Sequence, residues 1–226
     1  MLDSPATVAT RIAAAGVTHF RGSMPQLLVD NVGRAFAERR VFAGIRRDLS
    51  VGDRLLVRGS NGSGKSTLLK ILAGLLAASE GRVVYRIDGA ERTPHEARHA
   101  IGYLAPDLVL YDELTLIENL DCFARLRRLP TGGPNRLRLG RVGLADRADE
   151  PYGTLSTGLR QRVKLAFATQ ADPAVLLLDE PGSNLDASGH ALVEAAVAEA
   201  AVRGIVVIAT NDPDEFGLGN QVLELD

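Results

Sequence analysis

Residues 55–72 read LLVRGSNGSGKSTLLKIL, and this stretch decides the fold. It begins with a short apolar run, passes through a glycine-rich loop and ends in a segment whose leucines recur at helical spacing. The loop matches G-x-x-x-x-G-K-[ST], a pattern in which a buried strand delivers a phosphate-binding loop to the start of a helix. The residues of the loop are Gly59, Ser60, Asn61, Gly62, Ser63, Gly64, Lys65, Ser66 and Thr67.

The residue types of this loop suit a nucleoside triphosphate. Glycines let backbone N–H groups converge on a phosphate without a Cβ in the way. A helix expected over 66–77 points its positive dipole end at the same anion. Lys65 reaches the β- and γ-phosphates, and the Ser66 hydroxyl ligates Mg²⁺. A glycine-rich turn without a ligand is the alternative, but the flanking strand and helix are the context that the motif requires, so we predict ATP and Mg²⁺ binding.

A second element supplies two acids. The apolar run 175–178 is followed by Asp179 and Glu180. Ligands of open α/β sheets bind at the carboxyl ends of the strands, where these acids are expected. Asp179 is predicted to hold Mg²⁺, and Glu180 to polarise the water that attacks ATP. The alternative is an ordinary strand end with two surface acids.

Composition bounds the class of protein. The chain has 226 residues, enough for one large domain or one core with a smaller lobe. Its net charge of −2 gives no reason to expect a nucleic-acid partner. The single cysteine excludes an intramolecular disulfide. No run approaches the roughly 20 apolar residues that span a membrane, so a membrane role is expected to come through a partner.

Strand and helix patterns alternate along the chain, which predicts an α/β core with parallel pairing. We expect strands at 27–29, 41–42, 49–51, 55–57, 83–85, 101–104, 175–178, 205–209 and 222–225. Helices are expected at 66–77, over 114–144 with a break at 130–134, at 157–169 and at 187–202. The predicted domain covers 27–226 and includes a helical subdomain over about 105–165. Residues 1–26 are an N-terminal extension without a clear pattern.

The segment between the two predicted ATP motifs carries a family resemblance. It reads Leu155-Ser156-Thr157-Gly158-Leu159-Arg160-Gln161-Arg162 and resembles the LSGGQ signature of ABC-type ATPases, followed by that family's usual Gln-Arg. The resemblance covers roughly 27–226. It implies a P-loop NTPase core with a parallel sheet, an antiparallel β subdomain and an inserted helical subdomain.

The resemblance also implies site residues and partners. Two ATPase subunits, identical or different, pack head to tail, and Ser156 and Gly158 face the γ-phosphate bound to the other subunit. An ordinary helix N-cap at Ser156 is the alternative. Phe36 takes the place of the aromatic residue that stacks on adenine, or else is a core phenylalanine. Residues 183–186 resemble the D-loop, and 111–120 resemble the segment that meets a transmembrane permease.

Three positions depart from the family pattern. Pro106 stands where the Q-loop glutamine is expected, Asn211 where the switch histidine is expected, and Leu159 at the fifth signature position. Asn211 can still donate a hydrogen bond to the γ-phosphate, but it cannot carry a proton as histidine does. Pro106 has neither a side-chain amide nor a backbone N–H. Nucleotide binding is therefore predicted more securely than fast turnover.

The sequence thus predicts the ATP-binding and hydrolysing subunit of an ABC transporter, bound peripherally to the inner face of the cell membrane. The segment 104–126 and the helix after the signature resemble haem-exporter ATPases of cytochrome c maturation. Two alternatives stay open. One is a soluble ABC-type ATPase of assembly or repair, and the other is a slow nucleotide-dependent switch.

Overall fold

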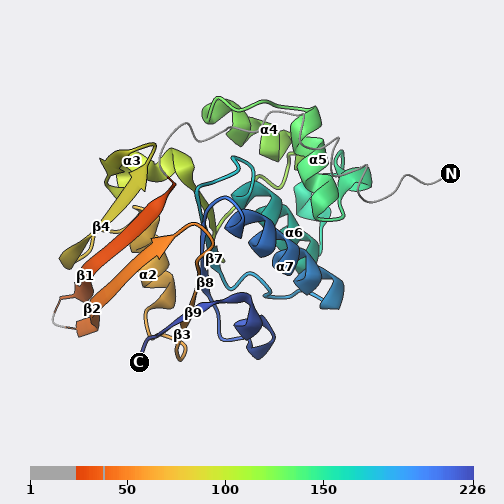
Figure 1. The fold of residues 1–226 in the computed structure, drawn as a ribbon. Helices are drawn as coiled ribbons and strands as arrows, with labels where there is room; N and C mark the ends of the chain where they lie inside the picture. Colours follow the sequence, from red (N-terminus) through yellow and green to blue (C-terminus); the bar gives the residue numbers. More distant parts are fainter. Residues whose placement is uncertain (1–23, 38) are drawn as a thin grey trace.

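A computed structural model describes residues 24–37 and 39–226, and its centre is a five-stranded parallel sheet (Figure 1). The strand order is β6-β7-β8-β3-β9. The central strands β7 and β8 are buried at every position, as expected for apolar strands that are covered on both faces. The strands are β3 (Arg54–Arg58), β6 (Ile101–Leu104), β7 (Val175–Asp179), β8 (Ile205–Ala209) and β9 (Gln221–Glu224).

Helices cover the two faces of this sheet (Figure 1). Because side chains alternate along a strand, Leu55 and Leu177 pack into one core with α2 (Lys65–Leu72). Their neighbours Leu56 and Leu176 pack into a second core with α6 (Thr157–Ala168) and α7 (Ala187–Ala201). The carboxyl ends of β3 and β7 consequently open at one edge, where the phosphate loop and the predicted acids lie.

A four-stranded antiparallel sheet, in the order β2-β1-β4-β5, packs on the α2 side. Its strands are β1 (Gln26–Phe36), β2 (Arg39–Ser50), β4 (Glu80–Ile87) and β5 (Ala90–Arg92). The separate strands expected at 41–42 and 49–51 are one long strand. Register shifts interrupt its pairing with β1, and Gly44 has a φ of 72°. These irregularities break the two-residue alternation that marks a strand in sequence.

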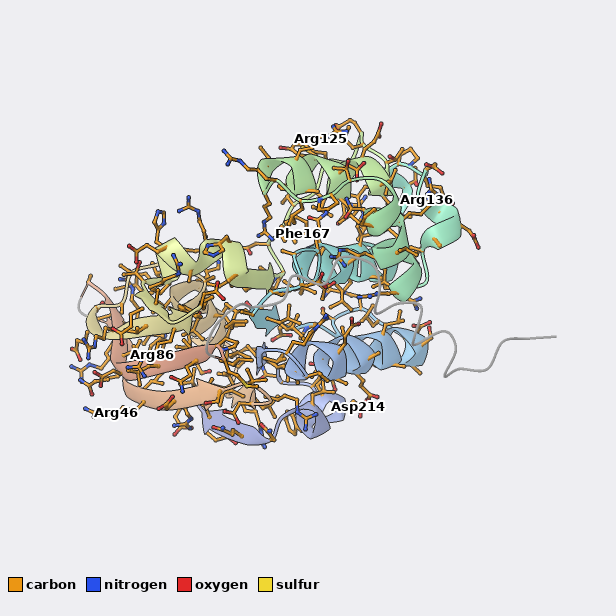
Figure 2. The ribbon with its side chains drawn as sticks, turned by 45° about the horizontal axis from the view of Figure 1, so that its top comes forward. Arg46, Arg86, Arg125, Arg136, Phe167 and Asp214 are labelled. Atoms are coloured by element: carbon orange, nitrogen blue, oxygen red, sulfur yellow. The ribbon has the colours of Figure 1, made fainter. Side chains whose placement is uncertain are left out.

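The helical subdomain contains α4 (Leu116–Leu126) and α5 (Gly133–Arg141), separated near the predicted break. Thr115 and Glu118 form a reciprocal capping box that starts α4. Phe123 of α4 packs edge-on against Phe167 of α6 with ring centroids 4.8 Å apart. Figure 2 shows Phe167 between these two helices, while Arg125 and Arg136 point outwards from the subdomain. Aromatic packing therefore joins the subdomain to the core.

Several elements differ from the sequence prediction. The helix expected over 66–77 ends at Leu72, because Gly74 adopts a φ of 73° and a Cβ there would lie 2.9 Å from His95 N. The short helices α3 (Pro94–Ala97) and η4 (Pro213–Leu218) were not predicted. Of the predicted extension 1–26, residues 1–23 lie outside the described part of the chain. No helix among the described residues is long and apolar enough to cross a membrane.

Candidate nucleotide site

The glycine-rich loop joins β3 to α2 and is shaped by residues without side chains. Gly62 and Gly64 have φ values of 85° and 103°, which favour glycine. A Cβ on Gly64 would lie 2.5 Å from Val41 Cγ1 and 2.9 Å from Phe42 Cδ1. Helix α2 begins at Lys65, directly after this turn. The loop therefore presents backbone N–H groups and a helix N-terminus to the same space.

Lys65 is buried, with 6% of its surface exposed, and its ammonium group faces back into its own loop. Its Nζ donates to the carbonyl oxygens of Gly59, at 2.8 Å, and Ser60, at 3.2 Å. No carboxylate of the described residues forms an ion pair with it. A buried cation held only by neutral carbonyls can exchange those contacts for an anion.

A cleft of about 760 Å³ lies over the loop. It is lined by Phe36, Arg39, Arg40, Val41, residues 60–67, Glu180 and Asp226. Phe36 is 48% exposed, which rules out a core phenylalanine. The Arg34 guanidinium lies 4.2 Å from the centre of its ring. The structure thus brings Phe36, the phosphate loop and Glu180 to one opening.

Asp179 ends β7 beneath the loop and is 1% exposed. Its Oδ1 accepts a hydrogen bond from Ser66 Oγ at 3.1 Å, while its Oδ2 has no hydrogen-bond partner. Burial raises the pKa of this carboxyl, and the Ser66 hydrogen bond opposes that shift. Ser63 Oγ is a second buried oxygen without a partner. An unpartnered carboxylate oxygen suits a hard cation such as Mg²⁺, and an unpartnered hydroxyl suits a phosphate beside it.

Glu180 follows Asp179 and turns away from the sheet. Its φ of 51° lies in the left-handed region, which costs a non-glycine residue about 1–3 kcal/mol. Its backbone N–H donates to Ala209 O at 2.8 Å. Such a conformation persists only where the surroundings hold it. Glu180 is among the residues that line the cleft.

Asn211 lies beyond the carboxyl end of β8 and touches the loop directly. Its Nδ2 donates to Asn61 Oδ1 at 2.6 Å. The side chain that replaces the family's switch histidine is therefore within reach of the phosphate loop. The amide has a second N–H, so its bond to Asn61 leaves one donor free.

The signature residues do not line this cleft. Ser156 is exposed and caps α6, accepting a hydrogen bond from Leu159 N at 3.4 Å. Gly158 packs against the 183–186 loop, where a Cβ would lie 2.7 Å from Asn184 O. In the single chain both predicted interpretations of Ser156, as a cap and as an exposed anion-binding group, are compatible with its position.

The sequence did not indicate two interactions that hold the segment around Pro106, the substituted Q-loop position. Lys164 Nζ donates to Pro106 O at 2.8 Å, and Lys70 Nζ contacts Asp107 Oδ2 at 2.9 Å. These two residues and Lys65 are the only lysines of the chain. In a chain with so few lysines, Lys70 and Lys164 could have been considered as candidates for a place near the site, as Lys65 was.

The match to known proteins agrees with this geometry. The family model described as ABC transporter matches residues 42–183, which span the phosphate loop, the signature and both acids. The chain belongs to the ABC transporter family as one of its ATP-binding subunits. ATP binding and ATP hydrolysis follow from this membership, which favours a transporter subunit over a soluble ATPase of assembly or repair.

Individual relatives narrow the comparison. The chain is 35% identical over 189 residues to the cytochrome c biogenesis ATP-binding export protein CcmA of Mesorhizobium japonicum, covering 83% of this chain and 92% of that protein. It is 30% identical over 211 residues to the protein of the same name from Photobacterium profundum, covering 88% and 98%. The sulfate/thiosulfate import ATP-binding protein CysA of Nephroselmis olivacea is 35% identical over 167 residues, which cover 71% of this chain and 48% of CysA.

Solved structures confirm the fold. A putative ABC transporter ATP-binding protein from Pyrococcus furiosus superimposes with a TM-score of 0.77 at 21% identity, covering 88% of this chain and 97% of that one. CbiO1 from Clostridium perfringens, described as part of the cbiONQ transporter complex, gives a TM-score of 0.75 at 25% identity, covering 90% and 86%. The predicted P-loop core with a parallel sheet, an antiparallel sheet and a helical subdomain is confirmed.

Proposed function

We propose that the chain is the ATPase subunit of an export system of the cytochrome c biogenesis type, working with a separate transmembrane permease. Support comes from relatives with that printed function, whose alignments include 83–88% of this chain and 92–98% of their own length. In this proposal the subunit sits on the inner face of the membrane. Nucleic acid has no part in it.

The phosphate loop holds the triphosphate through its backbone N–H groups, the N-terminus of α2 and Lys65. Ser66 and Asp179 hold Mg²⁺; the supporting observation is their 3.1 Å contact beside the unpartnered Asp179 Oδ2. The ion, when bound, neutralises charge on the phosphate oxygens. The remaining loop residues, Gly59, Ser60, Asn61, Gly62, Ser63, Gly64 and Thr67, shape the phosphate cradle, and Phe36 supports the adenine.

Glu180 is the residue that polarises the attacking water, since it follows the predicted metal ligand and lines the cleft. Asn211 donates a hydrogen bond to the γ-phosphate from beyond β8. Both roles need a phosphate over the loop, and both residues approach that loop from the carboxyl ends of neighbouring strands.

A second ATPase subunit completes the site. Ser156 and Gly158 lie at the N-terminus of the 12-residue helix α6, whose dipole favours an anion. Ser156 is exposed, so another subunit's γ-phosphate can reach it. The permease contacts the helical subdomain near 111–120, where Tyr111 is 53% exposed beside Val109 at 82%.

A slow nucleotide-dependent switch is the second candidate, and Pro106 favours it. Proline offers no donor at the position where the family places glutamine, and the Pro106 carbonyl is held by Lys164 Nζ at 2.8 Å. The two candidates differ in turnover rate and not in the architecture of the site.

The first test is Glu180→Gln in the purified full chain with Mg²⁺ and ATP. We expect ATP binding to be retained and the hydrolysis rate to fall about 100-fold, within the range for loss of a general base. Glu194→Gln removes an exposed acid on α7 and should leave the rate unchanged. Wild-type hydrolysis that Glu180→Gln leaves intact would show that Glu180 does not do the chemistry.

The transport part is tested in cells. Deletion of the gene should lower the cytochrome c content seen by haem staining, and wild type but not Lys65→Ala should restore it. The tagged protein should co-purify from membranes with a polytopic partner. Normal cytochrome c content in the deletion strain would remove the export assignment while leaving the ATPase assignment standing.

A further inference from the structure

Gln161 lies in the second turn of α6 and is 8% exposed. Its Nε2 donates two hydrogen bonds, to Glu180 O at 3.1 Å and to Pro181 O at 3.0 Å. A primary amide has two N–H donors, and both are used on consecutive carbonyls of one short segment. That segment includes Glu180, which lines the nucleotide cleft.

Gln161 binds a stretch of backbone whose conformation is unfavourable and must be stabilised by its surroundings. Glu180 is in the left-handed region, and its turn is otherwise closed by two backbone bonds, Glu180 N to Ala209 O at 2.8 Å and Ser183 N to Glu180 O at 3.2 Å. In the described part of the chain, Gln161 is the only side chain that donates to Glu180 O or Pro181 O. The carbonyl of Pro181 depends on it alone for a side-chain partner.

Gln161 acts together with two neighbours on its helix. Gly158, Gln161 and Arg162 are spaced i, i+3, i+4 and therefore share one face of α6. Gly158 lets the 183–186 loop approach closely, and Arg162 NH2 contacts Asp186 Oδ1 at 2.8 Å. One face of α6 thus contacts the chain at three points between Glu180 and Asp186.

We propose that Gln161 is a positioning residue for ATP hydrolysis, which fixes the Glu180 backbone and thereby aims its carboxylate. The inference rests on the proposed role of Glu180. Because Ser156 begins the same helix, a displacement of α6 at the signature is passed to Glu180 through Gln161. The helix face therefore links the signature end of a subunit to that subunit's own hydrolytic residue.

The test replaces the amide without emptying its space. Gln161→Met keeps an unbranched side chain of similar size and removes both donors. In the full chain with Mg²⁺ and ATP we expect kcat to fall about 10- to 100-fold, the scale for a misplaced catalytic group. The KM for ATP should change less than about threefold, since the phosphate loop is untouched. Gln161→Leu, which also removes both donors and buries no charge, should lower kcat in the same way and is the second variant should the first fold poorly.

Gln170 supplies a matched control, a second buried glutamine that lies in the turn just after the C-terminal end of the same helix. It is 2% exposed, and its Nε2 donates to Leu120 O at 2.6 Å and Asn135 Oδ1 at 3.0 Å, far from Glu180. Gln170→Met should lower the unfolding temperature with kcat within about twofold of wild type. A kcat of Gln161→Met within twofold of wild type, or an equal kcat loss in Gln170→Met, would overturn the inference. Glu180→Gln is run alongside: if it is as active as wild type, the proposed role of Glu180 has failed, which is a separate result.

Discussion

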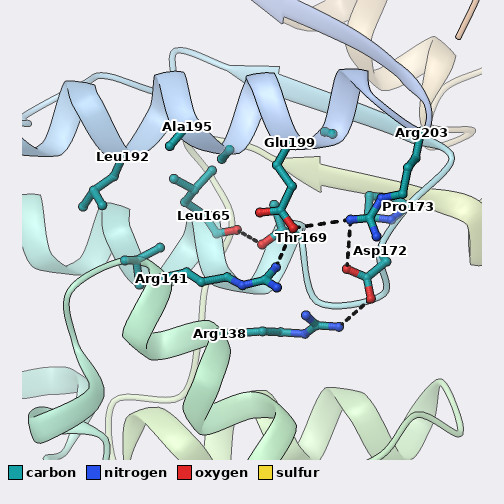
Figure 3. A pocket seen from close by; sticks show the side chains of 13 residues that line it. Arg138, Arg141, Leu165, Thr169, Asp172, Pro173, Leu192, Ala195, Glu199 and Arg203 are labelled. Carbon is teal, nitrogen blue, oxygen red and sulfur yellow. Dashed lines mark hydrogen bonds and ion pairs between the residues drawn. The ribbon is translucent and has the colours of Figure 1, made fainter. Parts of the chain in front are cut away.

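Two crevices of the molecule have their charged groups arranged in opposite ways. One is the nucleotide cleft. The other, here called the α5–α7 pocket, is a cavity of about 200 Å³ between α5, the end of α6 and α7 (Figure 3). Its floor is apolar, with Leu165, Leu192 and Ala195, and its rim carries charged side chains.

In the α5–α7 pocket the charges satisfy one another. Asp172 contacts Arg138 at 2.9 Å and Arg203 at 3.9 Å, while Glu199 contacts Arg141 at 2.9 Å and Arg203 at 3.4 Å. Figure 3 shows this chain of ion pairs running from α5 to α7. The network therefore fastens the helical subdomain to the core and leaves neither carboxylate without a cation.

In and beneath the nucleotide cleft, two buried oxygen atoms lack hydrogen-bond partners and the buried cation has no acidic partner among the described residues. Asp179 Oδ2 and Ser63 Oγ have none, and the buried Lys65 ammonium has only carbonyl oxygens of its own loop. Unpaired buried polar atoms are costly, and a bound ligand is one way to satisfy them. Arg138 Nε in the α5–α7 pocket also has no hydrogen-bond partner, but the same guanidinium pairs with Asp172. Both crevices are concave, so shape alone does not distinguish them. What distinguishes the structural pocket from the binding site is that its acidic and basic side chains pair with one another.

The largest expected effect comes from Lys65→Ala. Removing a buried cation that pairs with a phosphate costs about 3–4 kcal/mol, which is roughly 100- to 1,000-fold in affinity. Equilibrium titration of the purified chain with a fluorescent ATP analogue measures the change. Lys70→Ala is the control, because Lys70 is on the same helix but pairs with the exposed Asp107, and it should alter affinity by less than threefold. Equal effects of the two variants would contradict the contrast.

The local part of the site was predictable from sequence, and the parts built by tertiary contacts were not. The loop with Lys65 and the acids after 175–178 follow from a strand that is apolar throughout and a motif with fixed spacing. The bond between Asn211 and Asn61 and the one between Gln161 and Glu180 join residues 150 and 19 positions apart. No periodicity encodes such pairs, so the sequence indicated the residue types without their partners.

The fold shows the same limit. Fully buried strands such as β7 were evident, whereas β2 was divided in two because bulges disturb its alternation. Helix α2 was predicted too long, since the leucines beyond Leu72 continue the apolar pattern past the point where Gly74 turns the chain. Local patterns identified most elements, but close backbone approaches decided where they end.

Asp179→Asn is expected to have a smaller effect, which raises the stability of the nucleotide-free fold and lowers Mg²⁺-dependent hydrolysis. Burial raises the Asp179 pKa in the folded chain, so ionising this group destabilises the nucleotide-free fold at neutral pH. That penalty is fully present above the folded pKa and disappears as the pH falls through it towards the unfolded value. The variant should therefore unfold about 2–4 °C higher at pH 7, the shift for roughly 1 kcal/mol in a chain of this size, with Mg²⁺-dependent hydrolysis reduced.

Calorimetry from about pH 7 down to about pH 4, close to the ordinary pKa of an aspartate, measures this difference without added nucleotide. The gap in unfolding temperature between Asp179→Asn and wild type should narrow as the pH falls. A gap that widens on acidification would mean that the wild-type carboxylate is stabilised in the free protein. It would then be a satisfied structural acid like Asp172, and the contrast between the two crevices would be lost.

The smallest effect is expected from Asp172→Asn in the α5–α7 pocket. Asp172 has a φ of 46°, a conformation that asparagine also tolerates, so the substitution removes charge without straining the backbone. Its partner Arg138 is only 16% exposed, so we expect a loss of about 1 kcal/mol, near the upper end for ion pairs open to solvent. Asp149→Asn breaks the more exposed pair with Arg136 and should have no measurable effect. Denaturant unfolding compares the two variants, and kcat and KM should match wild type in both. A more than threefold change in kcat or KM for Asp172→Asn alone would show that the α5–α7 pocket takes part in ATP turnover. A charge that only holds the helical subdomain against the core would leave both constants unchanged.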